Sequence, residues 1–372
     1  MAQSTQSKHY YFHKTLTIPY GDMEHWVSDI FAATGLPKDV SDLVADSLID
    51  ADARGVYSHG AQRVKLYSKR IMLDCINREG KPKVIRDAGT LAVVDGDDAM
   101  GQVVGKFCME LAIEKAKEYG ISFVVANKSN HYGRCAFYTR MALEHDMIGF
   151  SATIGGGNLM APWGGSDPRV GNNPYSFSIP ANKHYPVVLD QAMSVVAKGK
   201  VDVAAKTHAT IPDTWALDRY GRPTTDPNEA LEGSLRPIAD YKGSGMAIVI
   251  GMLCSVISDA NIGPTLKTIY KDFDGSLGKG QMFMAIDVGR MTDIDAFKDR
   301  MDKQIEFVKE SPPAEGVEEV FLPGEMEYRN YDRQIKDGIV YPVEIINEIE
   351  TIAEGLGVAR PDWLVAMEKK AE

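Results

Sequence analysis

A histidine, an arginine and a tyrosine stand four residues apart from one another in the segment His59–Tyr67. In a helix that begins near Gly60, His59, Arg63 and Tyr67 would line one face. An imidazole can donate or accept a proton near neutral pH, and a guanidinium can hold a carboxylate through two hydrogen bonds. Reduction of a 2-oxo acid requires both. The alternative interpretation is a solvated polar face whose first turn is capped by Ser58.

A second histidine lies in the segment Asn127–Gly133, between a predicted strand and a predicted helix. Loops at strand ends of α/β proteins commonly hold catalytic groups. The positive end of the following helix would disfavour a protonated imidazole, so His131 would be a neutral group suited to taking a proton. The alternative is a histidine that only caps its own loop.

Three further segments could bind a cofactor. The glycines of Gly155–Gly165 permit close backbone approach, and Lys242 opens an apolar helix whose free N–H groups attract anions. Asp190 ends an apolar strand, where a carboxylate could bind ribose hydroxyls or orient a histidine. The alternatives are a conformationally demanding loop, a surface lysine and a structural carboxylate. Neither the GxGxxG fingerprint nor a P-loop occurs in the chain.

Hydrophobic periodicity predicts the elements that position these residues. Helical spacing begins at Asp22, at Pro37 and near Gly60, which indicates a small helical region. Strands and helices then alternate, as in a layered α/β body. The predicted strands are Leu91–Val94, Ile121–Ala126, Met147–Ile154, Tyr185–Leu189 and Phe283–Val288. The predicted helices are Val103–Tyr119, Gly133–His145, Gly243–Ile257, Ile294–Lys309 and Pro342–Leu356.

Composition excludes several classes of protein. A formal net charge of −11 would repel phosphate backbones, so no nucleic-acid partner is expected. The four cysteines are scattered without a CxxC pair, which argues against a disulfide framework or a zinc ribbon. No apolar run reaches the ~18 residues of a membrane helix, and the polar N-terminus lacks a signal-peptide core. We therefore expect no membrane association, a cytoplasmic location and an N-terminal arm of about a dozen residues.

Together these segments resemble the type-2 malate/L-lactate dehydrogenase family. Its members include ureidoglycolate dehydrogenase, 2,3-diketo-L-gulonate reductase, sulfolactate dehydrogenase and piperideine-2-carboxylate reductase. The resemblance extends from about Trp26 to about Gly357. The motifs that carry it are Ser58-His59-Gly60 with Arg63 and Tyr67, Ser129–Gly133, Ala161–Gly165, Asn173-Pro174, Leu189-Asp190, Ala197–Lys200, Lys242–Gly245 and Phe321–Glu325.

The resemblance implies an α/β fold without a Rossmann domain. A large mixed or antiparallel sheet flanked by helices would bind the cofactor, and the N- and C-terminal segments would form a small helical domain. On that basis residues 1–85 form the helical domain, joined by 327–372. Residues 86–326 form the α/β body, with 150–275 as the main NAD(P)-binding part. The resemblance also implies a homodimer or larger homo-oligomer whose active site a second subunit completes.

The resemblance further implies roles for matching residues. His59 and His131 are both candidates for the acid/base group, and Arg63 would bind the substrate carboxylate with Ser58 and Tyr67 nearby. The expected cofactor is NAD or NADP, with NAD favoured. Its predicted contacts are Gly156, Asp190, Gln191, Ala192, Lys242, Pro323, Gly324 and Glu325. Gly156 departs from the family pattern, since Ser or Thr often stands there, and Arg134 replaces a commonly small residue.

The predicted function is interconversion of a small 2-hydroxy acid and its 2-oxo acid, with malate, lactate and ureidoglycolate as examples. Reduction of a cyclic imino acid or a diketo sugar acid is an alternative, because an imino acid needs the same carboxylate anchor and proton donor. A metal-dependent lyase or hydrolase built on His59, His131 and Asp190 is an alternative of another class. No compact metal-ligand spacing supports it, so no metal is expected.

Overall fold

The computed structural model describes residues 14–371, with side chains up to residue 367. The predicted N-terminal arm lies outside these residues. The strands are β1 Thr15–Ile18, β2 Lys83–Ala88, β3 Leu91–Asp95, β4 Phe123–Ser129, β5 Met147–Thr153, β6 Tyr175–Ile179, β7 Val187–Gln191, β8 Ala216–Leu217, β9 Ser234–Leu235, β10 Lys279–Asp287 and β11 Ile339–Pro342. The helices are α1 Tyr20–Ala33, α2 Lys38–Ala53, α3 Val64–Met72, α4 Gly101–Tyr119, α5 Cys135–Thr139, α6 Lys198–Lys206, α7 Pro227–Glu232, α8 Tyr241–Gly251, α9 Ile294–Lys309, α10 Glu325–Asp337, α11 Val343–Gly355 and α12 Asp362–Ala371.

The chain divides into two compact units. The first unit contains the residues up to Glu79, together with Ser178–Val188 and the chain from Val288 onward. The second unit contains Gly80–Phe177 and Leu189–Asp287. Compared with the predicted boundaries, the first unit takes in two extra segments, 178–188 and 288–326. The carboxylate of Asp302 in α9 accepts hydrogen bonds from the backbone of Asn182, Lys183 and His184, which ties these two segments together.

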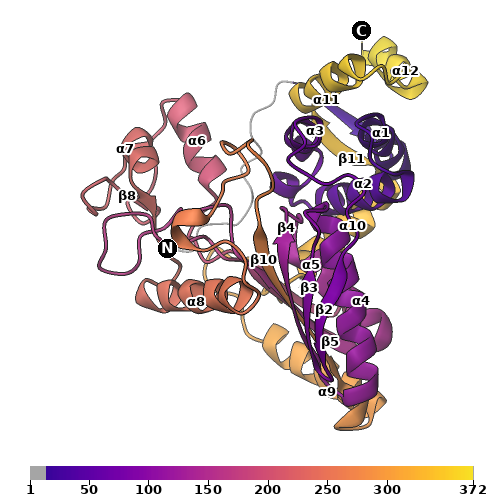
Figure 1. Ribbon diagram of the computed structural model, residues 1–372, viewed down its shortest axis with the longest axis vertical. Coiled ribbons are helices and arrows are strands. Elements are labelled where there is room, and N and C mark those ends of the chain that lie inside the picture. The colour runs from indigo at the N-terminus through magenta and orange to yellow at the C-terminus, as the bar shows by residue number, and fades with distance from the viewer. Residues whose placement is uncertain (1–13, 372) are drawn as a thin grey trace. The chain divides into compact units, whose positions relative to one another are not determined.

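A seven-stranded sheet has the strand order β2-β3-β4-β10-β5-β6-β7. β3 and β4 are parallel, with α4 as the crossover between them. β10 runs antiparallel to both of its neighbours, β4 and β5 (Figure 1). The prediction of a mixed sheet flanked by helices is confirmed, and antiparallel pairs at the centre distinguish this sheet from the parallel sheet of a Rossmann domain.

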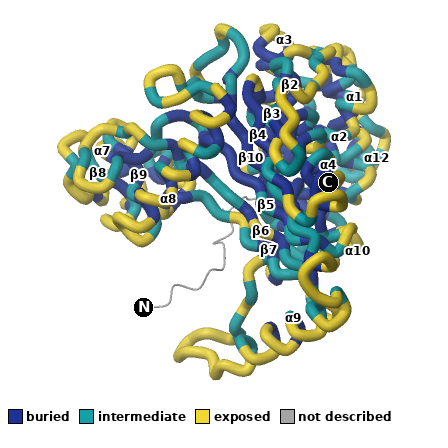
Figure 2. Tube along the Cα trace, turned by 60° about the horizontal axis from the view of Figure 1, so that its bottom comes forward, coloured by how far each residue is buried: buried dark blue, intermediate teal, exposed yellow. Residues whose placement is uncertain are grey.

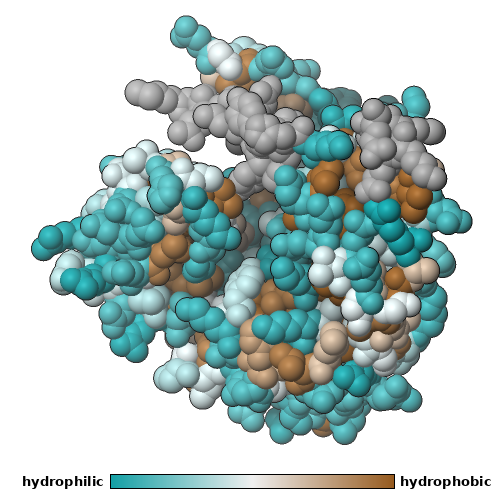
Figure 3. Space-filling model, turned by 90° about the horizontal axis from the view of Figure 1, so that it is seen from above, coloured by the Kyte–Doolittle hydropathy of each residue, from teal (hydrophilic) through white to brown (hydrophobic). Residues whose placement is uncertain are grey.

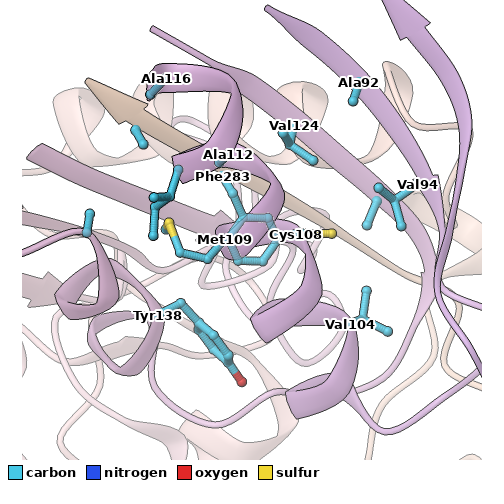
Figure 4. Packing of buried hydrophobic residues seen from close by; sticks show 14 of the residues in the cluster. Ala92, Val94, Val104, Cys108, Met109, Ala112, Ala116, Val124, Tyr138 and Phe283 are labelled. Atoms are coloured by element: carbon cyan, nitrogen blue, oxygen red, sulfur yellow. The ribbon is translucent and has the colours of Figure 1, made fainter. Parts of the chain in front are cut away.

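Alternating side chains of the sheet form two hydrophobic cores, one on each face. Val124 and Phe283 pack on one face against α4 and α5, where Met109 and Tyr138 complete the cluster (Figure 4). Val125 and Met282, their neighbours in sequence, pack on the other face with residues of α8. This alternation is what a strand buried on both faces requires. The central strands are accordingly the most buried part of the second unit (Figure 2).

In the first unit, α1, α2, α3, α10 and α11 pack together around the two-stranded β1–β11 sheet. Fully buried Val27, Phe31 and Leu48 lie in this core, and Trp26 meets Trp363 of α12 edge to face. Segments from both ends of the chain therefore build one helical layer, as the resemblance implied. No helix within residues 14–371 is both long and apolar enough to cross a membrane.

Two predicted helices are wrong in part. The third does not begin near Gly60, because the extended backbone of Gly60 separates two 3₁₀ turns, Tyr57–His59 and Ala61–Arg63, and α3 begins only at Val64. The helix predicted over Gly133–His145 is the five-residue α5 followed by a 3₁₀ segment. The helix predicted over Gly243–Ile257 is α8, which ends at Gly251, followed by the π-helical turn Met252–Val256. The remaining predicted helices agree with the structure to within a few residues at their ends.

Candidate active site

The predicted site residues fall into two groups, one in each compact unit. The first unit carries Ser58, His59, Arg63, Tyr67 and the turn Pro323–Glu325. The second unit carries His131, Gly156, Lys242 and the segment Asp190–Ala192.

Hydrogen bonds within the segment Tyr57–Arg63 bring the histidine and the arginine together. Arg63 Nε donates to the carbonyl oxygen of Ser58 at 2.7 Å, which places the guanidinium against the peptide group that joins Ser58 to His59. Ser58 Oγ and His59 Nδ1 lie 3.0 Å apart. The predicted helical face does not exist, since His59 and Arg63 stand on successive 3₁₀ turns. The loop nevertheless holds an imidazole, a hydroxyl and a guanidinium close together.

Tyr67 lies apart from this arrangement. It is on α3, its side chain is buried, and its ring packs against Phe31 with centroids 6.5 Å apart. This position favours a packing role for the ring in the helical core. A direct contact between Tyr67 and the substrate stays a prediction.

His131 lies in the loop between β4 and α5. Its Nδ1 accepts a hydrogen bond from the backbone N–H of Gly133 at 3.3 Å. With Nδ1 as an acceptor, a neutral ring carries its N–H on Nε2 and can donate a hydrogen bond there. The expected effect of a helix dipole on the His131 ring is not supported, because the following helix, α5, has only five residues.

Asp190 is tied to the same loop. Its Oδ2 accepts a hydrogen bond from the backbone N–H of Ala136 at 3.0 Å, at the start of α5. The buried Arg134 lies next to it, with Nε 3.6 Å from Oδ2. One carboxylate oxygen thus fixes the chain that follows His131. This contact supports the structural reading of Asp190, and its predicted contact with the cofactor is untested.

A series of backbone hydrogen bonds brings the predicted cofactor residues of the second unit together. Ile238 N donates to Met193 O, and Met193 N donates to Asn172 O, at 2.9 and 2.8 Å. Met193 follows Gln191 and Ala192, and Ile238 precedes Lys242. A Cβ on Gly155 would collide with Asn172, so the glycine loop lies against the same segment. Gln191 is fixed further by donating from Nε2 to Tyr175 Oη at 2.8 Å.

Sequence reasoning missed Lys279, a buried lysine at the first residue of β10. Its Nζ donates to the carbonyl oxygens of Gly155 and Lys267. Lys279 pairs in register with Ser129, which precedes the His131 loop. The lysine therefore supports the glycine loop from a strand that also borders the histidine loop. The sequence feature that could have indicated it is a charged residue three positions before the apolar run Met282–Ile286.

The turn Pro323–Glu325 packs against β7. Pro323 O accepts a hydrogen bond from Val188 N at 2.9 Å, and a Cβ on Gly324 (φ +86°) would lie 2.8 Å from the Val188 backbone oxygen. The buried Glu325 accepts hydrogen bonds from Lys309 and Arg329. Burial raises the pKa of Glu325. The hydrogen bonds from Lys309 and from the backbone of Leu322, together with the charges of Lys309 and Arg329, outweigh burial and hold the pKa below its ordinary value. The predicted cofactor contact of this turn is untested.

The second unit has features that fit a dinucleotide. A Cβ on Gly156 would meet no atom within 4 Å, so the backbone there is open to close approach. Lys242 is exposed in the first turn of the 11-residue α8, where free N–H groups and a cation suit a pyrophosphate. Within residues 14–371, no group of three or more His, Cys, Asp or Glu side chains could hold a metal ion.

Comparison with known proteins gives the family. Residues 18–350 match the model of the malate/L-lactate dehydrogenase family. The chain belongs to this family. It is 36% identical over 338 residues to the L-sulfolactate dehydrogenase of Methanocaldococcus jannaschii, covering 91% of this chain and 96% of that one. It is 31% identical over 315 residues to the ureidoglycolate dehydrogenase (NAD(+)) of Escherichia coli K12, covering 85% and 88%.

The fold agrees with that assignment. The solved structure of the sulfolactate dehydrogenase from M. jannaschii superposes with a TM-score of 0.86 at 35% identity, covering 92% of this chain and 98% of that one. The family inferred from the motifs is confirmed, and the chain is an oxidoreductase of the dehydrogenase class.

The two neighbouring glycines of the loop provide a matched pair of variants. Gly156→Ala should change the free energy of unfolding by less than ~0.5 kcal/mol, because its Cβ enters open space. If the cofactor lies over this backbone, the variant should bind it about tenfold more weakly. Gly155→Ala should instead destabilise the fold by ~1–3 kcal/mol, since its Cβ collides with Asn172. Calorimetry and a cofactor titration measure both effects, and wild-type affinity in Gly156→Ala would remove the loop from the cofactor site.

Proposed function

We propose that this dehydrogenase interconverts a small 2-hydroxy acid and its 2-oxo acid with a nicotinamide cofactor. The observation that carries the proposal is the Ser58–Arg63 hydrogen bond, which holds a guanidinium against the peptide group that joins Ser58 to His59. That pairing offers a carboxylate anchor next to an acid/base group. The named relatives support the substrate class, since sulfolactate and ureidoglycolate are both 2-hydroxy acids.

Each predicted residue has one task. Arg63 binds the substrate carboxylate, with Ser58 beside it. His59 or His131 delivers a proton to the carbonyl oxygen in reduction and removes it in oxidation. Proton transfer passes the ring between imidazolium and neutral imidazole, and the Gly133 contact at Nδ1 makes Nε2 the nitrogen of His131 that would face the substrate. The predicted cofactor contacts are Gly156, Asp190–Ala192, Lys242 and Pro323–Glu325, and the bound nicotinamide supplies or accepts the hydride. NAD is favoured over NADP, in line with the NAD(+)-dependent relative. The cytoplasmic location stays a prediction.

A substrate panel tests the proposal. The purified protein is mixed with NADH or NADPH and one acid from a set that contains oxaloacetate, pyruvate, sulfopyruvate, a cyclic imino acid and a diketo sugar acid. Loss of nicotinamide absorbance with a simple 2-oxo acid is the expected result. If only the cyclic imino acid or only the diketo sugar acid is turned over, the protein is a reductase of that acid and the proposed function is wrong. No turnover of any acid with either cofactor would contradict it.

Arg63→Lys should impair use of the acid while sparing the cofactor. Lysine keeps the positive charge but loses the planar two-donor fork and the Nε contact with Ser58. We expect kcat/KM for the acid to fall by ~10-fold or more, as for loss of a hydrogen bond to a charged group. Cofactor affinity, measured by fluorescence titration, should change little. Unchanged kinetics with the carboxylate substrate would remove Arg63 from the site.

His59→Ala and His131→Ala should each lower turnover by ~10²-fold or more, the usual contribution of a positioned acid or base. Cofactor binding should persist in both. One of them, more readily His131→Ala, should also remove a limb of the pH–rate profile near pH 6–7, the ordinary histidine range. Near-normal turnover in both variants with an unmoved profile would assign the proton to water or another residue.

The assembly we propose is a homodimer, supported by an apolar helix face. From Gly243 to Ile257, α8 and the π-helical segment that follows it carry no charged side chain. Ala247, Ile250 and Cys254 are buried, yet Met246, Val249, Met252 and Val256 are 49–61% exposed. On the face of the molecule seen in Figure 3, hydrophobic side chains reach the surface in groups among hydrophilic ones. A helix that is apolar all round is normally covered on every side.

Met252→Glu should convert the dimer to a monomer in sedimentation velocity, because it places a charge on this exposed apolar face. Met291→Glu is the control, since Met291 is 76% exposed but lies beyond α8. A wild-type protein that sediments as a monomer at working concentration would refute the dimer. A dimer that survives Met252→Glu would move the interface elsewhere.

A further inference from the structure

A buried carboxyl group lies beneath the segment that carries His59 and Arg63. Asp52, near the end of α2, is 1% exposed. Its Oδ2 accepts hydrogen bonds from the backbone N–H of Ala61 at 2.7 Å and from Tyr341 Oη at 3.0 Å. Tyr341 belongs to β11, so one oxygen joins α2, the loop and a strand from the other end of the chain. None of the roles assigned above uses this side chain.

The loop is also in direct contact with the other oxygen. A Cβ built on Gly60 would lie 1.7 Å from Asp52 Oδ1, so only glycine fits against the carboxyl group. Gly60 and Ala61 are the residues between His59 and Arg63 that join the two 3₁₀ turns. Both oxygens of Asp52 therefore contact the backbone that sets the separation of the imidazole and the guanidinium.

We infer that Asp52 is a positioning residue, which holds Gly60 and Ala61 in place and thereby sets the geometry of His59 and Arg63 toward the substrate. The inference rests on the proposed function for the tasks of those two residues. Asp52 itself is enclosed and contacts neither substrate nor cofactor in this account.

The surroundings favour the uncharged carboxyl group. Burial raises the pKa of Asp52 to about 8, against which the hydrogen bonds from Ala61 and Tyr341 act. The titratable groups that face it from neighbouring elements include Tyr57 and Tyr341. The side-chain amide of Gln334 donates to the backbone oxygen of Asp52. The positive charge of Arg333 lowers the pKa of Tyr57. Because the folded pKa lies above the ordinary 3.8, the stabilisation is complete below about pH 4 and is lost as the pH rises through about 8.

Two substitutions separate position from charge. Asp52→Asn keeps an oxygen that can accept from Ala61 and is neutral at every pH. It should retain kcat/KM within ~3-fold at pH 7 and flatten the decline of Tm between pH 5 and 9. Asp52→Ala leaves the Ala61 N–H without its acceptor. It should lower kcat/KM for the acid by ~10²-fold, as expected for a small misplacement of reacting groups, while cofactor affinity holds.

Tyr341→Phe is the matched control, since it removes a donor to the same oxygen but leaves the Ala61 contact, and it should keep near-wild-type kcat/KM. Hydrogen exchange over residues 57–63, read by mass spectrometry, reports on the loop without any turnover. Faster exchange there in Asp52→Ala, but not in Asp52→Asn, is expected even if the substrate class is wrong.

Three results would overturn the inference. The first is a folded Asp52→Ala with wild-type kcat/KM and unchanged exchange over the loop. The second is an equal loss of acid and cofactor binding in that variant, which would indicate a purely structural role. The third, which applies even if Asp52→Ala does not fold, is an Asp52→Asn variant whose kcat/KM for the acid falls by ~10²-fold at pH 7, although its side-chain oxygen can still accept from Ala61.

Discussion

The antiparallel pairing of β10 with both of its neighbours is the constraint on which the second unit depends. Because β4 and β5 each run antiparallel to β10, both end beside the start of β10. The His131 loop follows β4 and the glycine loop follows β5, so the two loops leave the sheet at the same end. Lys279, the first residue of β10, donates to the glycine loop and pairs in register with Ser129. Sheet topology therefore brings together two motifs that lie more than twenty residues apart in sequence.

Each unit supports its loop with a buried polar side chain. In the second unit a lysine donates to backbone carbonyls, and in the first a carboxyl group accepts a backbone N–H. Burying such groups is costly unless they are hydrogen-bonded, and satisfied networks rigidify their surroundings. The proposed hydride and proton transfer would require reacting groups to be held in place, and these contacts would then serve catalysis as well as stability.

The sequence was sufficient for the family, the mixed sheet and most helices, because long periodic segments such as Ile294–Lys309 and the ordered motifs are local features. It failed where the decisive contact is distant. The helix predicted from Gly60 does not form there, because the Asp52 carboxyl group lies where a side chain at position 60 would be. Tyr341, 289 residues from Asp52, donates a hydrogen bond to the same carboxyl group. Lys279 was missed for the same reason, since its acceptors come from two other segments. Periodicity reports which face is buried but not which polar partner lies there.

The central claim is that hydride passes between the nicotinamide ring and C2 of the acid. The most direct measurement uses NADH deuterated at the transferring position of C4, with mass spectrometry of the 2-hydroxy acid formed from a 2-oxo acid. The account predicts one deuterium at C2 of the product, retained in ordinary water, for one of the two C4 stereoisomers of the labelled cofactor. Product without deuterium at C2 from either stereoisomer, or label released to solvent, would contradict it.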